Sequence, residues 1–138
     1  MSESMKEHLK RFIENIEIKS VNLKKLSFYT KEAGQNQEAN VEIKLSIRPK
    51  LEKDGKVEFI YTHKENIVFE NNKLYIEIVY RLAIEFRGDA KTLKRNLLMA
   101  YARNSGLLVV YPYIRHLSDI IKREAGFIFS PLPHALIK

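Results

Sequence analysis

The chain has 138 residues, 45% of them hydrophobic and 30% charged, which is the size and composition of one domain with its own core. It contains no cysteine, so disulfides, thiolate metal sites, iron–sulfur clusters and a cysteine nucleophile are excluded. The formal net charge is +7, from 24 Lys and Arg against 17 Asp and Glu, and this balance favours an acidic partner such as nucleic acid.

The positive charge is concentrated in the C-terminal third. Residues 90–138 carry 8 basic and 2 acidic side chains, a net charge of +6, whereas residues 1–89 carry 16 and 15, a net charge of +1. The N-terminus lacks the apolar core of a signal peptide, and no apolar run reaches the roughly 18 to 20 residues of a membrane span. We therefore expect a cytoplasmic protein.

The N-terminal region predicts a short helix over residues 5–14 and then an irregular strand. Ile16 and Ile18 share one parity, Val21 and Leu23 the other, and the next pair, at 26 and 28, returns to the first. A flat strand would turn half of these side chains to the wrong face, so we expect a bulged or kinked strand. The polar stretch 30–40 is the longest predicted loop and could cross from one sheet edge to another.

Three strands with a period of two follow in residues 41–51, 57–69 and 74–86. Asp54-Gly55 predicts the first tight turn and Asn71-Asn72 the second, because these residues tolerate the left-handed backbone region. In the middle strand, His63 and Glu65 form a polar interruption of the apolar face. The last three strands therefore read as an antiparallel meander.

Beyond Gly88 the apolar period becomes helical. Asp89 is a plausible N-cap, and the first predicted helix ends near residues 104–106. A second helix is expected with Pro112 in its first turn and an end at Ala125-Gly126, followed by an extended tail over 127–133. The apolar stripe of the first helix is Leu93, Leu97, Ala100 and Tyr101; in the second, Ile114, Leu117, Ile120 and Ile121 point inward, and Arg115, Lys122 and Arg123 point outward.

These elements predict an α+β fold formed by a single domain over residues 1–138. A four-stranded antiparallel sheet, which is a meander with a bulged first strand and a crossover loop, is followed by C-terminal helices packed on one face.

Catalytic patterns are weak in this sequence. The four histidines, His8, His63, His116 and His134, lie on different elements, so surface or capping roles are expected for them. The five glycines are scattered and form no phosphate-binding loop. We therefore predict no enzyme activity, no cofactor and no metal site.

Two binding hypotheses remain from the residues alone. Lys91, Lys94, Arg95 and Arg103, with Tyr101 nearby, could contact phosphates and a base, although basic side chains on a helix also simply keep it soluble. The other feature is surplus apolar surface, at Tyr75, Val79 and Ala83 and in segments 107–113 and 127–132. Such a surplus indicates an oligomer interface, a peptide groove or both, unless it completes the core of a monomer.

The C-terminal third contains a recognisable series of short motifs. They are Leu98-Met99-Ala100-Tyr101, Tyr111-Pro112-Tyr113-Ile114-Arg115, Leu117-Ser118-Asp119-Ile120-Ile121, Arg123, Ala125-Gly126-Phe127 and Leu132-Pro133. This series resembles the SecB family of export chaperones. In that family a short helix leads to a Phe-Pro-Tyr-Ala-Arg segment, a long helix that begins Ile-Ser-Asp, a Gly-Phe-Pro turn and a Pro-containing extended tail. Order and spacing match over residues 97–133, and the strand-then-helix layout extends the likeness over most of the chain.

The resemblance implies an ATP-independent holdase, a homotetramer built as a dimer of dimers, that binds unfolded polypeptide in hydrophobic grooves. It assigns client binding to Phe28, Tyr29, Phe127, Phe129 and Leu132. It places Ile76, Ile78 and Tyr80 at subunit-interface positions, and Tyr75 and Glu77 at the segment that contacts the translocase motor SecA.

The sequence also departs from the export chaperones. Ile114 and His116 replace the family's Ala and Glu, and Arg81-Leu82 replaces a Gly-Gly pair. Export chaperones of this family are acidic, whereas this chain is basic and would repel the basic tail of SecA. A related branch holds an aggregation-prone antitoxin for a toxin–antitoxin system, so the client is expected to be either a preprotein or an antitoxin.

Overall fold

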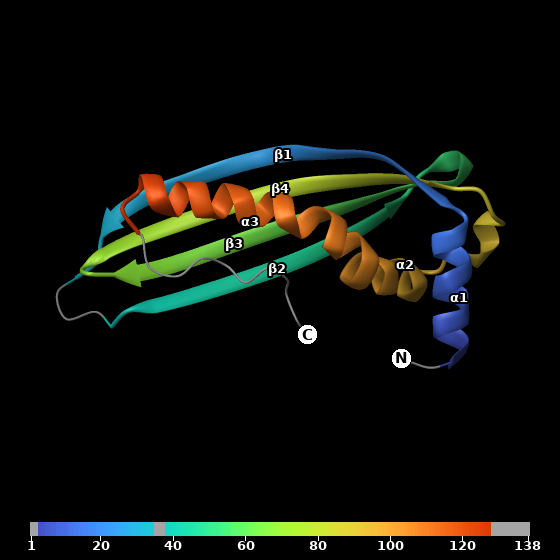
Figure 1. The fold of residues 1–138 in the computed structure, drawn as a ribbon, viewed down its shortest axis with the longest axis horizontal. Coiled ribbons are helices and arrows are strands. Elements are labelled where there is room, and N and C mark those ends of the chain that lie inside the picture. Colours follow the sequence, from blue (N-terminus) through green and yellow to red (C-terminus); the bar gives the residue numbers. More distant parts are fainter. Residues whose placement is uncertain (1–2, 35–37, 128–138) are drawn as a thin grey trace.

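The structure is a computed structural model that describes residues 3–34 and 38–127. In chain order its elements are α1 (Glu3–Glu14), β1 (Ile16–Glu32), β2 (Asn40–Leu51), β3 (Lys56–Phe69), β4 (Asn72–Phe86), α2 (Arg95–Tyr101) and α3 (Leu107–Glu124). The four strands form one antiparallel sheet in the order β1-β4-β3-β2, and α3 lies along one of its faces (Figure 1). The predicted α+β fold is confirmed.

The strand order explains the long connection after β1. Because β1 and β2 occupy opposite edges of the sheet, the chain between them crosses from one edge to the other, as predicted. Ala33 begins this connection, and its N–H donates to the Asn71 carbonyl at 2.7 Å.

The irregular spacing of apolar residues in β1 is resolved by two breaks in register. The pairing of β1 with β4 shifts between Ile18 and Ser20 and again between Leu23 and Lys25. Each shift changes the parity once. As a result, all the apolar side chains of β1 share the face on which α3 lies; they are Ile16, Ile18, Val21, Leu23, Leu26 and Phe28, paired with even-numbered residues of β4.

Both hairpin turns use left-handed backbone. Asp54 and Gly55 have φ values of 61° and 74°, in the turn predicted at these residues. The second turn has positive φ at Glu70 (48°) and Asn71 (67°), and Asn72 already belongs to β4. The turn therefore lies one residue earlier than predicted.

The helices differ from the prediction at their starts. A short 3-10 turn (Ala90–Thr92) comes first, and the Asp89 side chain caps it by accepting from the Lys91 N–H at 3.0 Å. A π-helical turn (Ala102–Gly106) then joins α2 directly to α3, so Pro112 is the sixth residue of α3 and not part of its first turn. Proline inside a helix leaves the carbonyl four residues earlier without a partner. That carbonyl belongs to Leu108, a residue that is 68% exposed as a whole.

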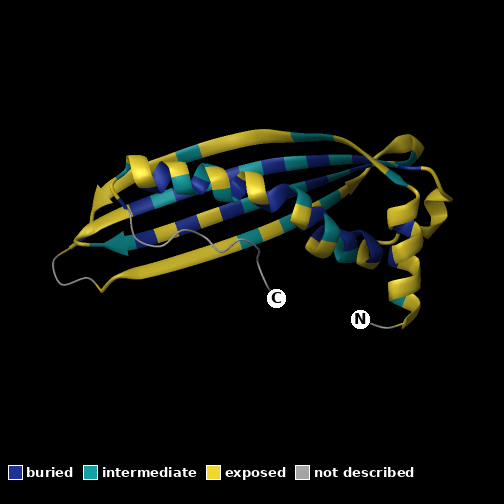
Figure 2. Cartoon of the chain, in the orientation of Figure 1, coloured by how far each residue is buried: buried dark blue, intermediate teal, exposed yellow. Residues whose placement is uncertain are grey.

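The core lies between the sheet and the three helices. On β3 and β4, buried side chains alternate with partly exposed ones, as Figure 2 shows. Phe12 of α1 stacks on Phe86 of β4, with ring centroids 5.3 Å apart, and contacts Tyr101 of α2 at 5.1 Å. Tyr61 of β3 donates its hydroxyl to the Ala102 carbonyl at 2.8 Å, which ties the π-helical turn to the sheet.

Within residues 3–34 and 38–127, no helix is both long enough and apolar enough to cross a membrane.

Candidate functional site

The apolar face of the sheet is only half covered. An α-helix with its side chains is about 10 to 12 Å across, whereas four strands about 4.8 Å apart are nearly twice as wide. Helix α3 lies over the central strands, where Tyr113 packs on Tyr80 of β4 and Lys122 reaches Glu65 of β3. Among the described residues, no helix covers the edge strands β1 and β2 over much of their length (Figures 1 and 2).

Two exposed apolar strips result. The β1 strip consists of Ile18, Leu23, Leu26 and Phe28, which are 39% to 54% exposed. The β2 strip consists of Val41, Ile43 and Leu51, which are 38% to 48% exposed. Each residue shares the face of buried neighbours on the adjoining central strand; Phe28, for example, is paired with Ile76, which has no exposed surface. Apolar side chains that could complete a core are thus left in solvent.

Helix α3 extends the β1 strip. Tyr113 is 50% exposed, and its ring lies 5.7 Å from that of Tyr80, which pairs with Leu23 of β1. Ile120, predicted to point inward, is 39% exposed instead, and it lies two helical turns beyond Tyr113 on the same side. The β1 strip therefore has a hydrophobic wall on α3.

The structure separates the predicted client-binding residues. Phe28 belongs to the β1 strip, but Tyr29 points to the other face of the sheet, where its ring stacks on Tyr75 at 5.2 Å. Phe127 is 5% exposed and lines a pocket of about 200 Å³, together with Thr30 and Phe69. Phe129 and Leu132 lie outside the described residues. Of the three that lie within the described residues, only Phe28 presents an exposed side chain on the strips.

The residues predicted at a subunit interface lie in the core. Ile76 and Ile78 have no exposed surface and Tyr80 is 7% exposed, because α3 and the neighbouring strands cover them. The positions that β4 offers to another molecule are those of opposite parity. The assignment of these three residues to an interface stays a prediction.

Glu77, the predicted SecA-contact position, is held by two lysines. Lys25 Nζ lies 2.5 Å from one of its carboxylate oxygens, and Lys64 Nζ lies 3.7 Å from the other. The hydrogen bond from Lys25 is the main cause that lowers the pKa of Glu77. The Glu77 carboxylate is therefore ionised, and the two lysines of the same chain neutralise its charge.

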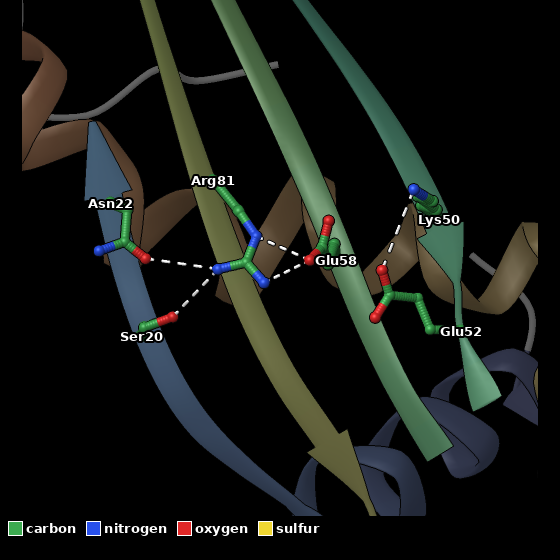
Figure 3. Close-up of polar contacts among 6 residues, drawn as sticks. All are labelled: Ser20, Asn22, Lys50, Glu52, Glu58 and Arg81. Carbon is green, nitrogen blue, oxygen red and sulfur yellow. Dashed lines mark hydrogen bonds and ion pairs between the residues drawn. The ribbon is translucent and has the colours of Figure 1, made fainter. Parts of the chain in front are cut away.

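The outer face of the sheet, opposite α3, is polar and ion-paired. Arg81 of β4 donates through Nε to Glu58 of β3 at 2.8 Å, and its NH1 group reaches Ser20 and Asn22 of β1 (Figure 3). Lys50 and Glu52, drawn in the same figure, form an ion pair with Nζ and Oε1 4.0 Å apart. The Arg81 guanidinium lowers the pKa of Glu58, and Glu58 in turn raises the pKa of Arg81. The exposed apolar strips thus belong to one face only.

A buried polar cluster beneath α3 was not predicted. His63 and Glu65 of β3 and Ser118 of α3 have no exposed surface, and Lys122 is 5% exposed. Glu65 joins them: His63 Nε2 lies 3.0 Å from its Oε2, Lys122 Nζ lies 2.9 Å from Oε1, and the Ser118 hydroxyl donates to Oε2. His63 is therefore not a surface residue, and Lys122 does not point outward.

The cluster keeps Glu65 charged in the core. Burial alone would raise the pKa of its carboxyl, but hydrogen bonds from His63, Lys122 and Ser118 outweigh burial and lower it. Tyr111 is buried nearby, and its desolvation, with the negative charge of Glu65, raises the pKa of its hydroxyl to about 12. The sequence did contain a signal for this cluster. His63 and Glu65 continue the alternate positions of β3 that begin with Phe59 and Tyr61, and those positions are buried.

Tyr101, the aromatic residue predicted to assist nucleic-acid binding by the basic helical residues, is not accessible to a base. Tyr101 is 1% exposed, in contact with Phe12 and Phe59, whereas Lys91, Lys94, Arg95 and Arg103 are exposed. Among the described residues, no group of three or more His, Cys, Asp or Glu side chains could hold a metal ion.

Comparison with known proteins detects the fold only through structure. No family model matches the chain, and no curated protein matches its sequence. The SecB-like chaperone of Mycobacterium tuberculosis, solved in complex with a ChAD peptide from the HigA1 antitoxin, superposes with a TM-score of 0.76 at 13% identity, over 97% of this chain and 99% of that one. A protein of unknown function from Streptococcus agalactiae has a TM-score of 0.38 at 11% identity, over 85% and 98%. The chain therefore has a SecB-like fold.

Proposed function

We propose that this protein is a SecB-like, ATP-independent chaperone that holds unfolded or partly folded polypeptide on the β1 and β2 strips. The observation that carries the proposal is the row of half-exposed Ile, Leu, Val and Phe side chains beside α3. Large contiguous apolar surfaces on a monomer mark binding sites. All the residues that define the two strips are apolar, so the surface can accept many sequences loosely.

The expected affinity requires a client that uses both strips. Covering one half-exposed Leu or Phe side chain should contribute roughly 1 kcal/mol, about half the value for full burial. Burial of the four residues of the β1 strip then contributes about 4 kcal/mol and that of the β2 strip about 3 kcal/mol more, before the cost of association and of ordering the client is subtracted, so one strip alone is too weak a site. A folded client exposes too few apolar side chains to contact both strips, whereas an unfolded chain can cross α3 and contact both.

The free edges of the sheet support the same function. β1 and β2 each pair on one side only among the described residues, so their backbone groups are available to an added strand. Either a client segment or a second copy of the chain could use them. We propose a homo-oligomer, a dimer of dimers, in which the apolar strips that clients do not occupy are covered between copies.

The client class follows from the charges. The related fold from M. tuberculosis holds an antitoxin peptide, which supports a polypeptide client. Glu77 is neutralised by Lys25 and Lys64, and the chain carries +7, so a basic SecA tail finds no free acidic contact at this position. We therefore propose a dedicated client such as an antitoxin, held in the cytoplasm, in preference to delivery of preproteins to SecA.

An aggregation assay without ATP tests the proposal. The purified protein at several-fold excess should suppress light scattering by a denatured model client. The double variant Leu26→Ser/Phe28→Ser should lose most of this activity, and Leu108→Ser, an equally drastic change on the outer side of α3, should retain it. Suppression by neither the parent protein nor the control would contradict a holding function, and equal suppression by all three would exclude the β1 strip.

A further inference from the structure

One end of the outer face joins an exposed aromatic pair to an unpaired pair of lysines. Tyr29 of β1 is 57% exposed and stacks on Tyr75 of β4, with an interplanar angle of 28°. Two residues further along the same strands, Lys31 and Lys73 are directly opposite each other. These four residues, Tyr29, Lys31, Lys73 and Tyr75, are called the edge patch below.

Several carboxylates of the outer face are already paired with basic side chains of the chain, whereas the lysines of the edge patch form no ion pair among the described residues. Glu17 is paired with Lys19 and Arg87, Glu58 with Arg81, and Glu77 with Lys25 and Lys64. Within the described part of the chain, Lys31 and Lys73 have no acidic partner at ion-pair distance, and both are exposed. Like charges directly opposite on one face of a sheet repel each other, and an anion bound between them would relieve the repulsion.

The edge patch is continuous with the β1 strip. Phe28 and Tyr29 are consecutive residues of an edge strand, so their side chains lie on opposite faces of the sheet, and both are more than half exposed. A polypeptide seated on Phe28 can pass over the free edge of β1 and reach the outer face at Tyr29. From Phe28 to Lys31 the distance along the strand is about 10 Å, which an extended chain covers in roughly three residues.

We infer that the edge patch selects clients in which acidic residues closely follow the apolar segment held by the β1 strip. This inference rests on the proposed holding function and names its client class. A carboxylate lies between the ammonium groups of Lys31 and Lys73, and the Tyr29–Tyr75 stack supports the adjoining side chain. Polypeptide fits better than nucleic acid because the patch continues into an apolar strip, where a phosphate backbone would be desolvated without a partner. In addition, the two tyrosine rings are stacked on each other, so each ring has only one face left on which a base could stack.

Two fluorescent peptides of one sequence test the inference on the full chain. Each carries an aromatic and aliphatic segment followed, within five residues, by either two Asp or two Asn residues. The Asp peptide should bind about tenfold more tightly at 50 mM salt, and the difference should shrink at 300 mM as the charges are screened. In Lys31→Gln/Lys73→Gln the preference for Asp should disappear while the affinity for the Asn peptide is unchanged.

The control variant is Lys91→Gln/Lys94→Gln, which removes the same charge from exposed positions outside the patch and should keep the full preference. Single Lys73→Gln, expected to lose part of the preference, is used if the double variant does not fold. Equal affinity for both peptides in the parent protein overturns the inference and leaves the holding function intact. Failure of both peptides to bind, together with no suppression of aggregation, overturns the holding function itself. An oligonucleotide that displaces the Asp peptide and binds only when Lys31 and Lys73 are present would reassign the patch to nucleic acid.

Discussion

Replacing Lys122 by methionine should strongly destabilise the fold, although the side chain belongs to a helix that also packs through apolar contacts. Lys122 Nζ lies 2.9 Å from Glu65 Oε1, and the pair is almost wholly out of solvent. At an effective dielectric constant of about 20, two unit charges at this distance attract each other by about 6 kcal/mol. Methionine keeps the volume and removes the charge, so Glu65 remains as a buried carboxylate without its cation.

The expected loss of unfolding free energy is about 3 to 5 kcal/mol, the range typical of a broken buried ion pair. It is smaller than the Coulomb attraction because lysine also loses hydration on burial, and because His63 and Ser118 still hydrogen-bond to Glu65. With a urea m-value of about 2 kcal/mol/M, the midpoint should fall by about 1.5 to 2.5 M.

Equilibrium urea unfolding followed by circular dichroism measures the effect. Protein concentration must be the same for all variants, because an oligomer's apparent stability depends on it. The double variant Glu65→Leu/Lys122→Met removes both charges and should recover most of the loss, with a coupling energy of about 2 kcal/mol or more. A loss below about 1 kcal/mol for Lys122→Met, with coupling below about 0.5 kcal/mol, would refute the buried pair.

Two further predictions concern the same core. Because the pKa of Glu65 is lowered in the folded chain, its stabilising effect is present above the ordinary value of 4.5 and is lost as the pH falls through the lower folded value. Urea unfolding between pH 7 and 3 should therefore show the parent protein and Glu65→Gln converging below about pH 4.5; a constant difference would contradict the lowered pKa. At the π-helical turn, a Cβ on Gly106 would lie 2.5 Å from the Tyr61 hydroxyl, so Gly106→Ala should cost about 1 to 3 kcal/mol in the parent protein and less in Tyr61→Phe. Thermal unfolding of the parent protein, the two single variants and the double variant tests this. An equal loss of stability from Gly106→Ala with Tyr61 and with Phe at position 61 would exclude the clash.

The sheet could be predicted because the alternation of apolar and polar residues that marks each strand is a local pattern in the sequence. In β1, the phase of the apolar residues changes twice within 13 residues, and each change corresponds to one observed shift in register. The prediction succeeded because a face that packs against a helix tolerates few misplaced apolar side chains. The connection between opposite edges of the sheet was also predicted, from the length and polarity of the stretch 30–40.

The buried cluster was harder to foresee because residue type and position disagreed there. His63 and Glu65 have the parity of the core, but their polarity suggested an interruption of the buried face. What permits their burial is Lys122 on α3, which is 57 residues away from Glu65 in sequence. A polar residue is satisfied in a core only through partners of this kind, and a single sequence does not show which distant helix supplies them.

The start of α3 shows a similar competition between local and tertiary preferences. Proline favours the first turn of a helix, yet Pro112 lies well inside α3. The reason is the segment before it: Leu107, Val110 and Tyr111 are buried, and helical backbone lets them pack on the sheet. Burial of these side chains outweighs the one backbone hydrogen bond that the proline removes.

The distribution of charge separates this chain from an acidic export chaperone more clearly than its total does. The net charge of +6 on residues 90–138 suggested a basic helical surface. However, Lys122, one of the eight basic residues of this segment, is buried in the core, where it is paired with Glu65. The unpaired lysines that adjoin exposed aromatic rings lie on the sheet instead, at Lys31 and Lys73. An acidic partner is therefore expected on the face opposite α3, and apolar segments on the face beside it. A single polypeptide that carries both features can reach the β1 strip and the edge patch over the free edge of β1, so the choice of client is linked to the basic charge of the chain.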